Sequence, residues 1–258
     1  MKKFLALVLA MVMVMSLVAC GSAKSDNATW EDQLGQKGKL RVGMATDYPP
    51  YETYDAEGNV IGFDADMAQK IADYLGVELE IVPMDFDTII TAVAAHTLDL
   101  GISCFSYNEE RAQSVLFTNT YMTSAQACFG STKYGIKTME DLKDGLVGAG
   151  NGTTGMDVAE DLKDDYGYTT QAGEIAVMTE AVKAGAMQAI ITEKCVADSY
   201  INSDPASYQM IADDLTVEEI KGITALDNNA LLDKVNEAIA SIMADEANYN
   251  QLILDWFG

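Results

Sequence analysis

The chain has 258 residues with 16 basic and 40 acidic side chains, which gives a formal net charge of −24. Such a negative field repels nucleic acid and anionic lipid headgroups, so neither is expected as a partner. Hydrophobic residues make up 49% of the chain, which excludes a wholly disordered protein. The chain has a single histidine, which excludes a histidine-rich metal centre. That histidine is expected at a solvated helix end, which argues against a Ser-His-Asp triad.

The N-terminus predicts a cleaved secretory signal. Lys2 and Lys3 precede an apolar run at residues 4–14. The alternative interpretation of this run is a membrane-spanning helix. Such a helix needs roughly 20 apolar residues, and the run is shorter than that. Residues 17–22 resemble the lipobox of bacterial lipoproteins, which implies a signal over residues 1–19 and acyl chains on Cys20. Residues 20–29 would then form a tether, and the protein would be lipid-anchored at the outer face of the cytoplasmic membrane.

The first part of the body alternates strands and helices. The pattern predicts strands at residues 40–44, 77–81 and 98–102, with helices at 64–75 and 87–95 between them. This order favours a parallel sheet with helices on its faces. In the first helix, Met67, Ile71, Tyr74 and Leu75 are expected to share one buried face, and Gly76 ends the helix.

The same alternation then restarts. Strands are expected at 125–129, 146–147 and 189–191, helices at 155–166 and 179–183, a helix start at Thr138, and two tail helices at 230–243 and 246–257. Two α/β units in sequence predict two lobes, and a cleft between lobes is the usual place for a small-molecule site. The pattern alone does not show which segments return to the first lobe.

Arg111 and Glu193 are candidate ligand-binding charges. A guanidinium offers a rigid fork for a carboxylate, although Arg111 could equally pair with Glu109 or Glu110 at the surface. Glu193 follows an apolar strand, and the carboxyl ends of parallel strands face the ligand crevice. Its carboxylate could bind an ammonium, or it could compensate a helix dipole.

A glycine-rich segment at residues 148–155 lies between a strand and a helix. Its exposed amides and the hydroxyls of Thr153 and Thr154 could bind an anion, although such loops are often only tight turns. It lacks the Gly-Lys-Ser/Thr of a phosphate-binding loop. Tyr48 and Phe86 lie near strand ends, where they could form a ligand wall or pack in the core.

The single histidine and the cysteines of the body do not indicate a catalytic or metal-binding site. His96 is expected to be a solvated cation at the end of a helix. Three cysteines remain besides Cys20, namely Cys104, Cys128 and Cys195. Because their number is odd and they form no Cys-x-x-Cys pair, buried thiols are expected rather than a disulfide framework or zinc site. A Cys104–Cys128 bridge is left open.

In combination, several motifs resemble the polar-amino-acid solute-binding proteins of ABC importers, the bacterial extracellular family 3. The segments that carry this resemblance are residues 40–43, 48–52, 62–66, 99–100, 110–112, 152–155 and 255–258. The resemblance implies an α/β type II periplasmic-binding fold, with two α/β lobes joined by a two-strand hinge. Lobe 1 would comprise residues 30–123 and a return segment at 222–258, and lobe 2 would comprise residues 124–221.

The resemblance also implies roles for individual residues. Arg111, the Thr153 hydroxyl and the Thr154 amide would bind the ligand carboxylate. Ser106, the backbone at Cys104 and the side chain of Glu193 would bind its α-ammonium. Tyr48 and Phe86 would enclose the ligand side chain.

This sequence departs from the family pattern at several positions. Cys104 stands where Gly is more frequent, and Ser106 and Asn108 stand where Thr is more frequent. Glu193 replaces the usual Asp and Cys195 the usual Pro. These changes bear on ligand identity more than on fold.

The resulting prediction is a monomeric, non-catalytic receptor that captures a polar or charged amino acid and delivers it to an ABC permease. No cofactor or metal is expected. One alternative is an enzyme related to cyclohexadienyl dehydratase, in which Glu193 would act as a general acid. Another is a sensor subunit that presents its ligand to a membrane receptor.

Overall fold

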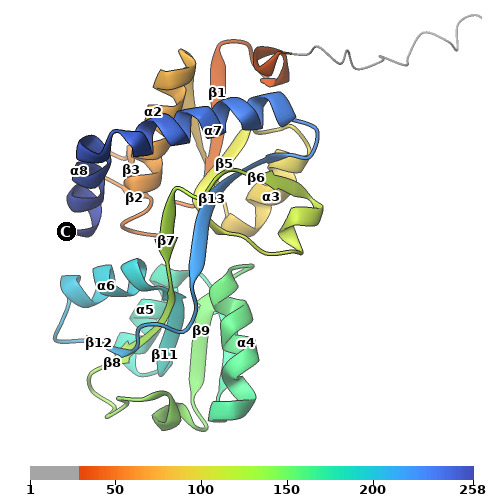
Figure 1. Ribbon diagram of the computed structural model, residues 1–258. Coiled ribbons are helices and arrows are strands. Elements are labelled where there is room, and N and C mark those ends of the chain that lie inside the picture. The colour runs from red at the N-terminus through yellow and green to blue at the C-terminus, as the bar shows by residue number, and fades with distance from the viewer. Residues whose placement is uncertain (1–28) are drawn as a thin grey trace, which may run out of the picture.

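The computed structural model describes residues 29–258, so the predicted signal, Cys20 and nearly all of the tether lie outside the described residues. The chain forms two lobes, each built on its own sheet, with two extended segments passing between them (Figure 1). The predicted two-lobed α/β fold is therefore confirmed. Among the described residues, no helix is long and apolar enough to cross a membrane.

Lobe 1 is built on a six-stranded sheet in the order β4-β1-β5-β13-β6, with β7 also paired to β13. Its strands are β1 (Lys39–Met44), β4 (Glu78–Pro83), β5 (Leu100–Ser106), β6 (Val115–Phe117), β7 (Met122–Ser124) and β13 (Glu218–Ala225). Strand β1 is parallel to β4 and β5, whereas β13 is antiparallel to its neighbours. Its helices are η1 (Trp30–Gln33), α2 (Phe63–Leu75), α3 (Phe86–Ala94), η2 (Arg111–Gln113), α7 (Asn229–Ala244) and α8 (Glu246–Phe257), and a small hairpin joins β2 (Thr53–Tyr54) to β3 (Val60–Ile61).

Lobe 2 is built on a five-stranded sheet in the order β10-β9-β11-β8-β12. Its strands are β8 (Gln126–Ser131), β9 (Leu146–Gly150), β10 (Thr169–Gly173), β11 (Ala189–Glu193) and β12 (Tyr208–Ala212). Its helices are η3 (Met139–Leu142), α4 (Thr154–Tyr166), α5 (Ile175–Ala184) and α6 (Lys194–Ser203). Strands β9, β10 and β11 are parallel, so their carboxyl ends meet at one edge of the sheet.

The chain crosses between the lobes twice, from β7 to β8 and from β12 to β13 (Figure 1). The residue limits predicted for the lobes stay predictions, since the structure shows only where sheet membership changes. Several elements were not predicted, because their stretches of sequence carry no clear apolar period. These are the strands β2, β3, β6, β7, β10, β12 and β13 and the helices η1, η2 and α6. The tail helices were predicted closely, and α7 packs against α2.

Local chemistry accounts for most helix limits. Gly76, Gly167 and Gly185 end α2, α4 and α5 in the left-handed conformation that glycine adopts without a steric penalty. The buried face of α2 includes Met67 and Ile71 as predicted. Tyr74 is half exposed, so its assignment to the buried face was wrong. A tyrosine has a polar hydroxyl on an apolar ring, so a half-exposed position at the edge of the apolar stripe is favourable for it.

The described cysteines are free thiols, and the bridge left open between Cys104 and Cys128 does not form. Cys128 lies in the core of lobe 2, whereas Cys104 lies at the lobe boundary. His96 follows the end of α3 and is half exposed, and its Nε2 lies 3.0 Å from Asp227 Oδ1. The position predicted for His96 at the end of a helix is therefore confirmed.

Gly62 connects the β2–β3 hairpin to α2 and has a φ of 139°. Here the backbone of Pro50 and Tyr51 accepts hydrogen bonds from Phe63 N and Asp64 N. A Cβ on Gly62 would lie 2.0 Å from the Tyr51 carbonyl oxygen. The close approach of two backbone segments therefore requires glycine at this position.

We expect Gly62→Ala to lower the free energy of unfolding by about 3 kcal/mol, because it combines an unfavourable φ with a backbone clash. Urea unfolding monitored by circular dichroism measures this change. Gly58→Ala is the matched control, since Gly58 also has a positive φ but open space around it. Its cost should be limited to the roughly 1–2 kcal/mol of the left-handed conformation. Equal costs for the two variants would contradict the backbone clash.

Candidate functional site

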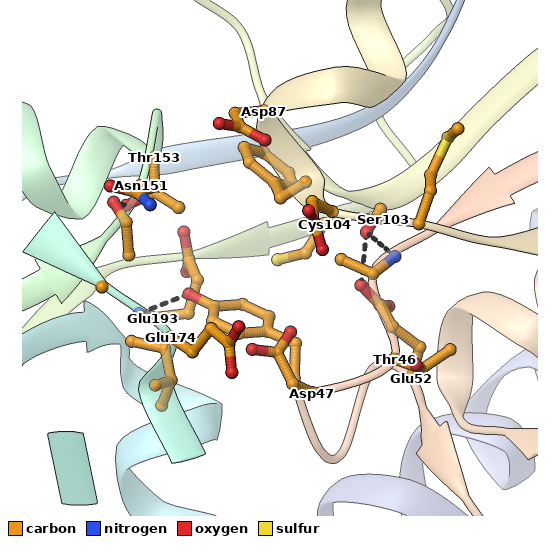
Figure 2. Close-up of a pocket in the computed structure, with 18 of the residues that line it drawn as sticks. Thr46, Asp47, Glu52, Asp87, Ser103, Cys104, Asn151, Thr153, Glu174 and Glu193 are labelled. Carbon is orange, nitrogen blue, oxygen red and sulfur yellow. Dashed lines mark hydrogen bonds between the residues drawn. The ribbon is translucent and has the colours of Figure 1, made fainter. Parts of the chain in front are cut away.

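A cavity of about 440 Å³ lies between the two lobes. Its walls come from the loops after β1 and β4 and from β5 in lobe 1, and from β8 and the loops after β9, β10 and β11 in lobe 2. Most of these segments follow the carboxyl ends of parallel strands, where side chains of several strands converge. Figure 2 shows polar side chains from both lobes turned toward this space.

The structure brings most of the predicted site residues together in the cavity wall. Those residues are Tyr48, Phe86, Cys104, Arg111, Thr153, Thr154 and Glu193. Ser106 is buried behind the wall, where its hydroxyl lies 3.5 Å from Glu193 Oε1. The roles assigned to these residues stay predictions.

Arg111 is held rigidly at the lobe boundary. Its Nη1 donates to the Ser106 carbonyl at 2.7 Å, and its Nη2 donates across the cleft to the Gly152 carbonyl at 2.8 Å. The guanidinium also lies over the stacked rings of Phe86 and Phe105, 5.4 and 5.8 Å from their centroids. Burial lowers the pKa of Arg111, but a guanidinium remains charged in proteins. The alternative of a surface salt bridge to Glu109 or Glu110 is not found among the described ion pairs.

The glycine-rich loop brings the N-terminus of α4 to the cavity. Thr153 is the N-cap, and its hydroxyl accepts from Met156 N and donates to the Gly150 carbonyl at 2.9 Å. The Thr154 hydroxyl accepts from Gln126 Nε2 at 3.1 Å. The helix dipole therefore presents partial positive charge to the cavity, on the same side as Arg111.

Glu193 is the last residue of β11 and is buried. Its Oε1 accepts from Gln126 Nε2 at 2.7 Å, whereas Oε2 is buried and has no hydrogen-bond partner among the described residues. Burial raises the pKa of Glu193 to about 8. A buried carboxylate oxygen without a donor is a suitable acceptor for a ligand ammonium.

Tyr48 joins the lobes at the same place. Its hydroxyl lies 2.8 Å from Thr192 Oγ1 and accepts from Glu193 N at 3.2 Å. Together with the bond from Arg111 to Gly152, this contact indicates that the described structure has its lobes closed on the cavity.

Five acidic residues besides Glu193 line the cavity, and none of them was a predicted site residue. Glu52 is one of these residues, and it is fully buried. The other four have exposed or partly exposed side chains. Asp47, Asp85 and Asp87 come from lobe 1 and Glu174 from lobe 2. None of them takes part in an ion pair that the structure describes. Burial raises the pKa of Asp47, and the charges of Glu174 and Asp85 add to the rise. Figure 2 shows Asp47 and Glu174 close to one another, although they belong to different lobes.

The strand-end rule that selected Glu193 could also have found these four acids. Asp47 follows β1, Asp85 and Asp87 follow β4, and Glu174 directly follows β10. Gln126 was also missed, and it donates to both Glu193 and Thr154. It begins the first strand of lobe 2, and nothing in the local sequence distinguishes it from an ordinary polar strand residue.

The arrangement offers one anchored cation, a helix N-terminus and an unpaired buried carboxylate, with more carboxylates around them. Within residues 29–258, no cluster of His, Cys, Asp and Glu side chains could hold a metal ion. The family profile of bacterial extracellular solute-binding proteins, family 3, matches residues 40–258. The chain belongs to this family. The predicted family, and with it a solute-binding function outside the cytoplasm, is confirmed.

Individual relatives agree with this assignment over nearly the whole chain. The arginine-binding extracellular protein ArtP of Bacillus subtilis (strain 168) is 31% identical over 259 residues, which cover 100% of this chain and 98% of ArtP. A solved structure of an ancestral arginine-binding protein bound to arginine is 32% identical, with a TM-score of 0.80, and the match covers 86% of this chain and 99% of that one.

A second solved structure bears on the enzyme alternative. It is the ancestral amino acid-binding protein AncCDT-1, a precursor of cyclohexadienyl dehydratase, with 30% identity and a TM-score of 0.80. The match covers 88% of this chain and 99% of AncCDT-1. ArtP, the ancestral arginine-binding protein and AncCDT-1 are thus all named as binding proteins.

Proposed function

We propose that this protein is the receptor of an ABC importer and captures an amino acid with a cationic side chain between its lobes. Arg111 and Glu193 carry this proposal, because they supply opposite buried charges to one cavity and come from different lobes. The receptor performs no catalytic step, acts as a monomer and passes its ligand to a membrane permease.

A zwitterion fits the two charges. The ligand carboxylate would take hydrogen bonds from Arg111 and from the amides at the start of α4, and the ammonium would donate to Glu193 Oε2. Both ligand charges lose their hydration in the cleft, so each needs a charged or oriented partner. Because the partners come from both lobes, only the closed form completes the set, and ligand binding therefore favours closure.

The acidic surroundings favour a cationic side chain over a neutral or acidic one. Asp47, Asp85, Asp87 and Glu174 have no described cationic partner, so a guanidinium or ammonium of the ligand would relieve their mutual repulsion. An acidic ligand side chain would add to that repulsion. The names of ArtP and of the ancestral arginine-binding protein support arginine as the first ligand to test.

We expect arginine, lysine or ornithine to bind at least about tenfold more tightly than glutamine, a difference of about 1.4 kcal/mol, and glutamate to bind least. Isothermal titration calorimetry of the protein without residues 1–28 measures this order. Asp47→Asn and Glu174→Gln should each weaken binding of the cationic ligand more than binding of glutamine. Glu180→Gln is the matched control, since Glu180 is an exposed residue of α5 outside the cavity wall. A preference for glutamate would contradict the proposed ligand class.

The lipid anchor at Cys20 belongs to this proposal. It rests on the lipobox-like residues 17–22, which lie outside the described residues. A receptor tethered to the outer membrane face would stay close to its permease, which raises its effective concentration there.

The same cavity also bears on the enzyme alternative. A buried carboxyl group with a pKa of about 8 can act as a general acid, and Glu193 has this property. Perturbed carboxyl groups equally serve binding sites, and Glu193 already faces the space where an ammonium fits. AncCDT-1 is named as an amino acid-binding protein, so the likeness to it supports the receptor.

A further inference from the structure

Two buried carboxyl groups lie beside Cys104, one of them in the cavity wall and the other behind it. Glu52 precedes β2, and Asp64 lies in the first turn of α2, and both have no exposed surface. Neither takes part in an ion pair within the described residues. The side chains of Glu52 and Asp64 lie within hydrogen-bonding reach of one another. Two adjacent buried carboxylates without a cation are strongly unfavourable, so this pair must hold a proton.

The hydrogen bonds indicate where the proton resides. Asp64 accepts from Cys104 N at 2.6 Å and from the Tyr121 hydroxyl at 2.8 Å, and it also lies at the positive end of α2. Glu52 accepts only from Ser103 Oγ, at 2.6 Å, and its Oε2 has no donor among the described residues (Figure 2). Asp64 is therefore stabilised as the anion, and a proton on Glu52 Oε2 gives a hydroxyl that can donate toward Asp64.

The surrounding charges favour the same distribution. Burial raises the pKa of Glu52 well above its ordinary value, and the charges of Asp64 and Asp47 raise it further. Burial also raises the pKa of Asp64, to about 6, against the effect of the bonds from Cys104 and Tyr121. The other titratable groups against the pair are the thiol of Cys104 and the phenol of Tyr121, and neither carries positive charge.

The pair contacts an irregular part of β5. In the pairing of β5 with β13, Gly101 lies opposite Ile223 and Phe105 lies opposite Lys221. Three residues of β5 therefore lie between these pairs, whereas β13 has only one residue there. Within this bulge Cys104 has a φ of 49°, an unusual value for a residue with a side chain. Its N–H points out of the strand ladder and is satisfied by Asp64 instead. The adjacent Ser103 hydroxyl accepts from Ala45 N and donates to Glu52.

We propose that Glu52 and Asp64 form a carboxyl pair that shares one proton and fixes the bulge at Cys104 in the shape required for ligand binding. Asp64 is then a positioning residue that acts through the Cys104 backbone, and Glu52 is its neutral partner. The effect of this pair on ligand affinity rests on the proposed amino acid-binding function. The shared proton itself does not depend on that function.

Glu52→Gln tests the neutral state, because a glutamine side chain can accept from Ser103 and donate toward Asp64 as the protonated acid does. At pH 7 we expect this variant to bind arginine within about twofold of the wild type, a difference of less than 0.5 kcal/mol. At higher pH the wild type loses the proton, so the ratio of its Kd to that of the variant should rise. Comparing the two proteins at each pH cancels the titration of the ligand itself.

Burial raises the pKa of Glu193 to about 8, so this group is also protonated at pH 7, and the infrared spectra are therefore compared in a Glu193→Gln background. In that background the ligand-free protein at pH 7 should show the carbonyl stretch of a protonated acid, and adding Glu52→Gln should remove this band. Asp64→Asn should weaken arginine binding at least about tenfold, because the amide cannot serve both Cys104 N and the Tyr121 hydroxyl as an acceptor. Glu57→Gln is the matched control, since Glu57 is an exposed residue of the same hairpin.

Loss of binding in Glu52→Gln at pH 7, or absence of the infrared band, would overturn the proposal. If Asp64→Asn does not fold, these two measurements on Glu52→Gln still decide the outcome. If the wild type binds no amino acid, the proposed function fails, and the infrared band and the pH dependence of unfolding still test the shared proton in the ligand-free protein.

Discussion

Arg111→Ala should weaken binding of the amino acid by a factor of about 100 to 1,000, which corresponds to roughly 3–4 kcal/mol. The substitution removes the buried cation for the ligand carboxylate and leaves the carbonyl oxygens of Ser106 and Gly152 without their donor. Closure also loses its bond from Arg111 to Gly152, so the variant should populate the open form more. Calorimetry measures the affinity, and small-angle X-ray scattering with and without ligand measures closure.

Arg111→Lys separates charge from geometry. Lysine keeps the positive charge but lacks the planar fork and the favourable stacking on Phe86 and Phe105. We expect it to restore only part of the affinity. Arg41→Lys is the matched control, since Arg41 pairs with Asp99 outside the cavity wall and should leave binding unchanged. Wild-type affinity in Arg111→Ala would show that the carboxylate site lies elsewhere.

Glu193→Gln should lose most of the amino acid affinity, by about a hundredfold at pH 8, because the ligand ammonium loses its buried counter-charge. In the wild type, burial raises the pKa of this carboxyl group to about 8. The group is therefore mostly protonated at lower pH and must release its proton before it pairs with the ammonium. The affinity of the wild type should rise about tenfold per pH unit up to about pH 8, and the variant should lack this rise.

The free energy of unfolding of the ligand-free protein should fall as the pH rises, whereas the ligand affinity rises. A carboxyl group whose pKa is higher in the folded state than in the unfolded state binds its proton more tightly when folded. The protonated Glu193 carboxyl group therefore contributes fully to the free energy of unfolding below about pH 4.5, and this contribution is lost as the pH rises toward 8. Glu193→Gln removes this loss, so the variant should be more stable than the wild type at pH 8.

Urea unfolding at several pH values and calorimetry in buffers of different ionisation enthalpy test both halves of this prediction. Glu140→Gln serves as the control, since Glu140 is an exposed residue of the same lobe. A variant that binds as the wild type does, or an affinity that falls between pH 6 and 8, would contradict the assignment of Glu193 to the ammonium.

The sequence by itself determined most local elements of this protein. The apolar face of α2 and the glycines that end α2, α4 and α5 act within a few residues, so their pattern is readable along the chain. Arg111 and Glu193 could be selected for the same reason, since one belongs to a recognisable motif and the other lies at the end of an apolar strand. Tyr74 shows the limit of this approach, because the edge of an apolar stripe is set by the helix packed against it.

Only the tertiary structure decided how these elements act together. Strand β13 pairs with β5 far away in the sequence. Its sequence mixes charged and apolar residues without a clear period, and most of its residues are buried only because the strand lies inside the sheet. Asp47, Asp85 and Glu174 can each be placed near a strand end, but only the tertiary structure brings the ends of β1, β4 and β10 around one cavity. The shared proton of Glu52 and Asp64 depends on burial and on donors from β5, and these long-range conditions cannot be computed from the order of residues along the chain.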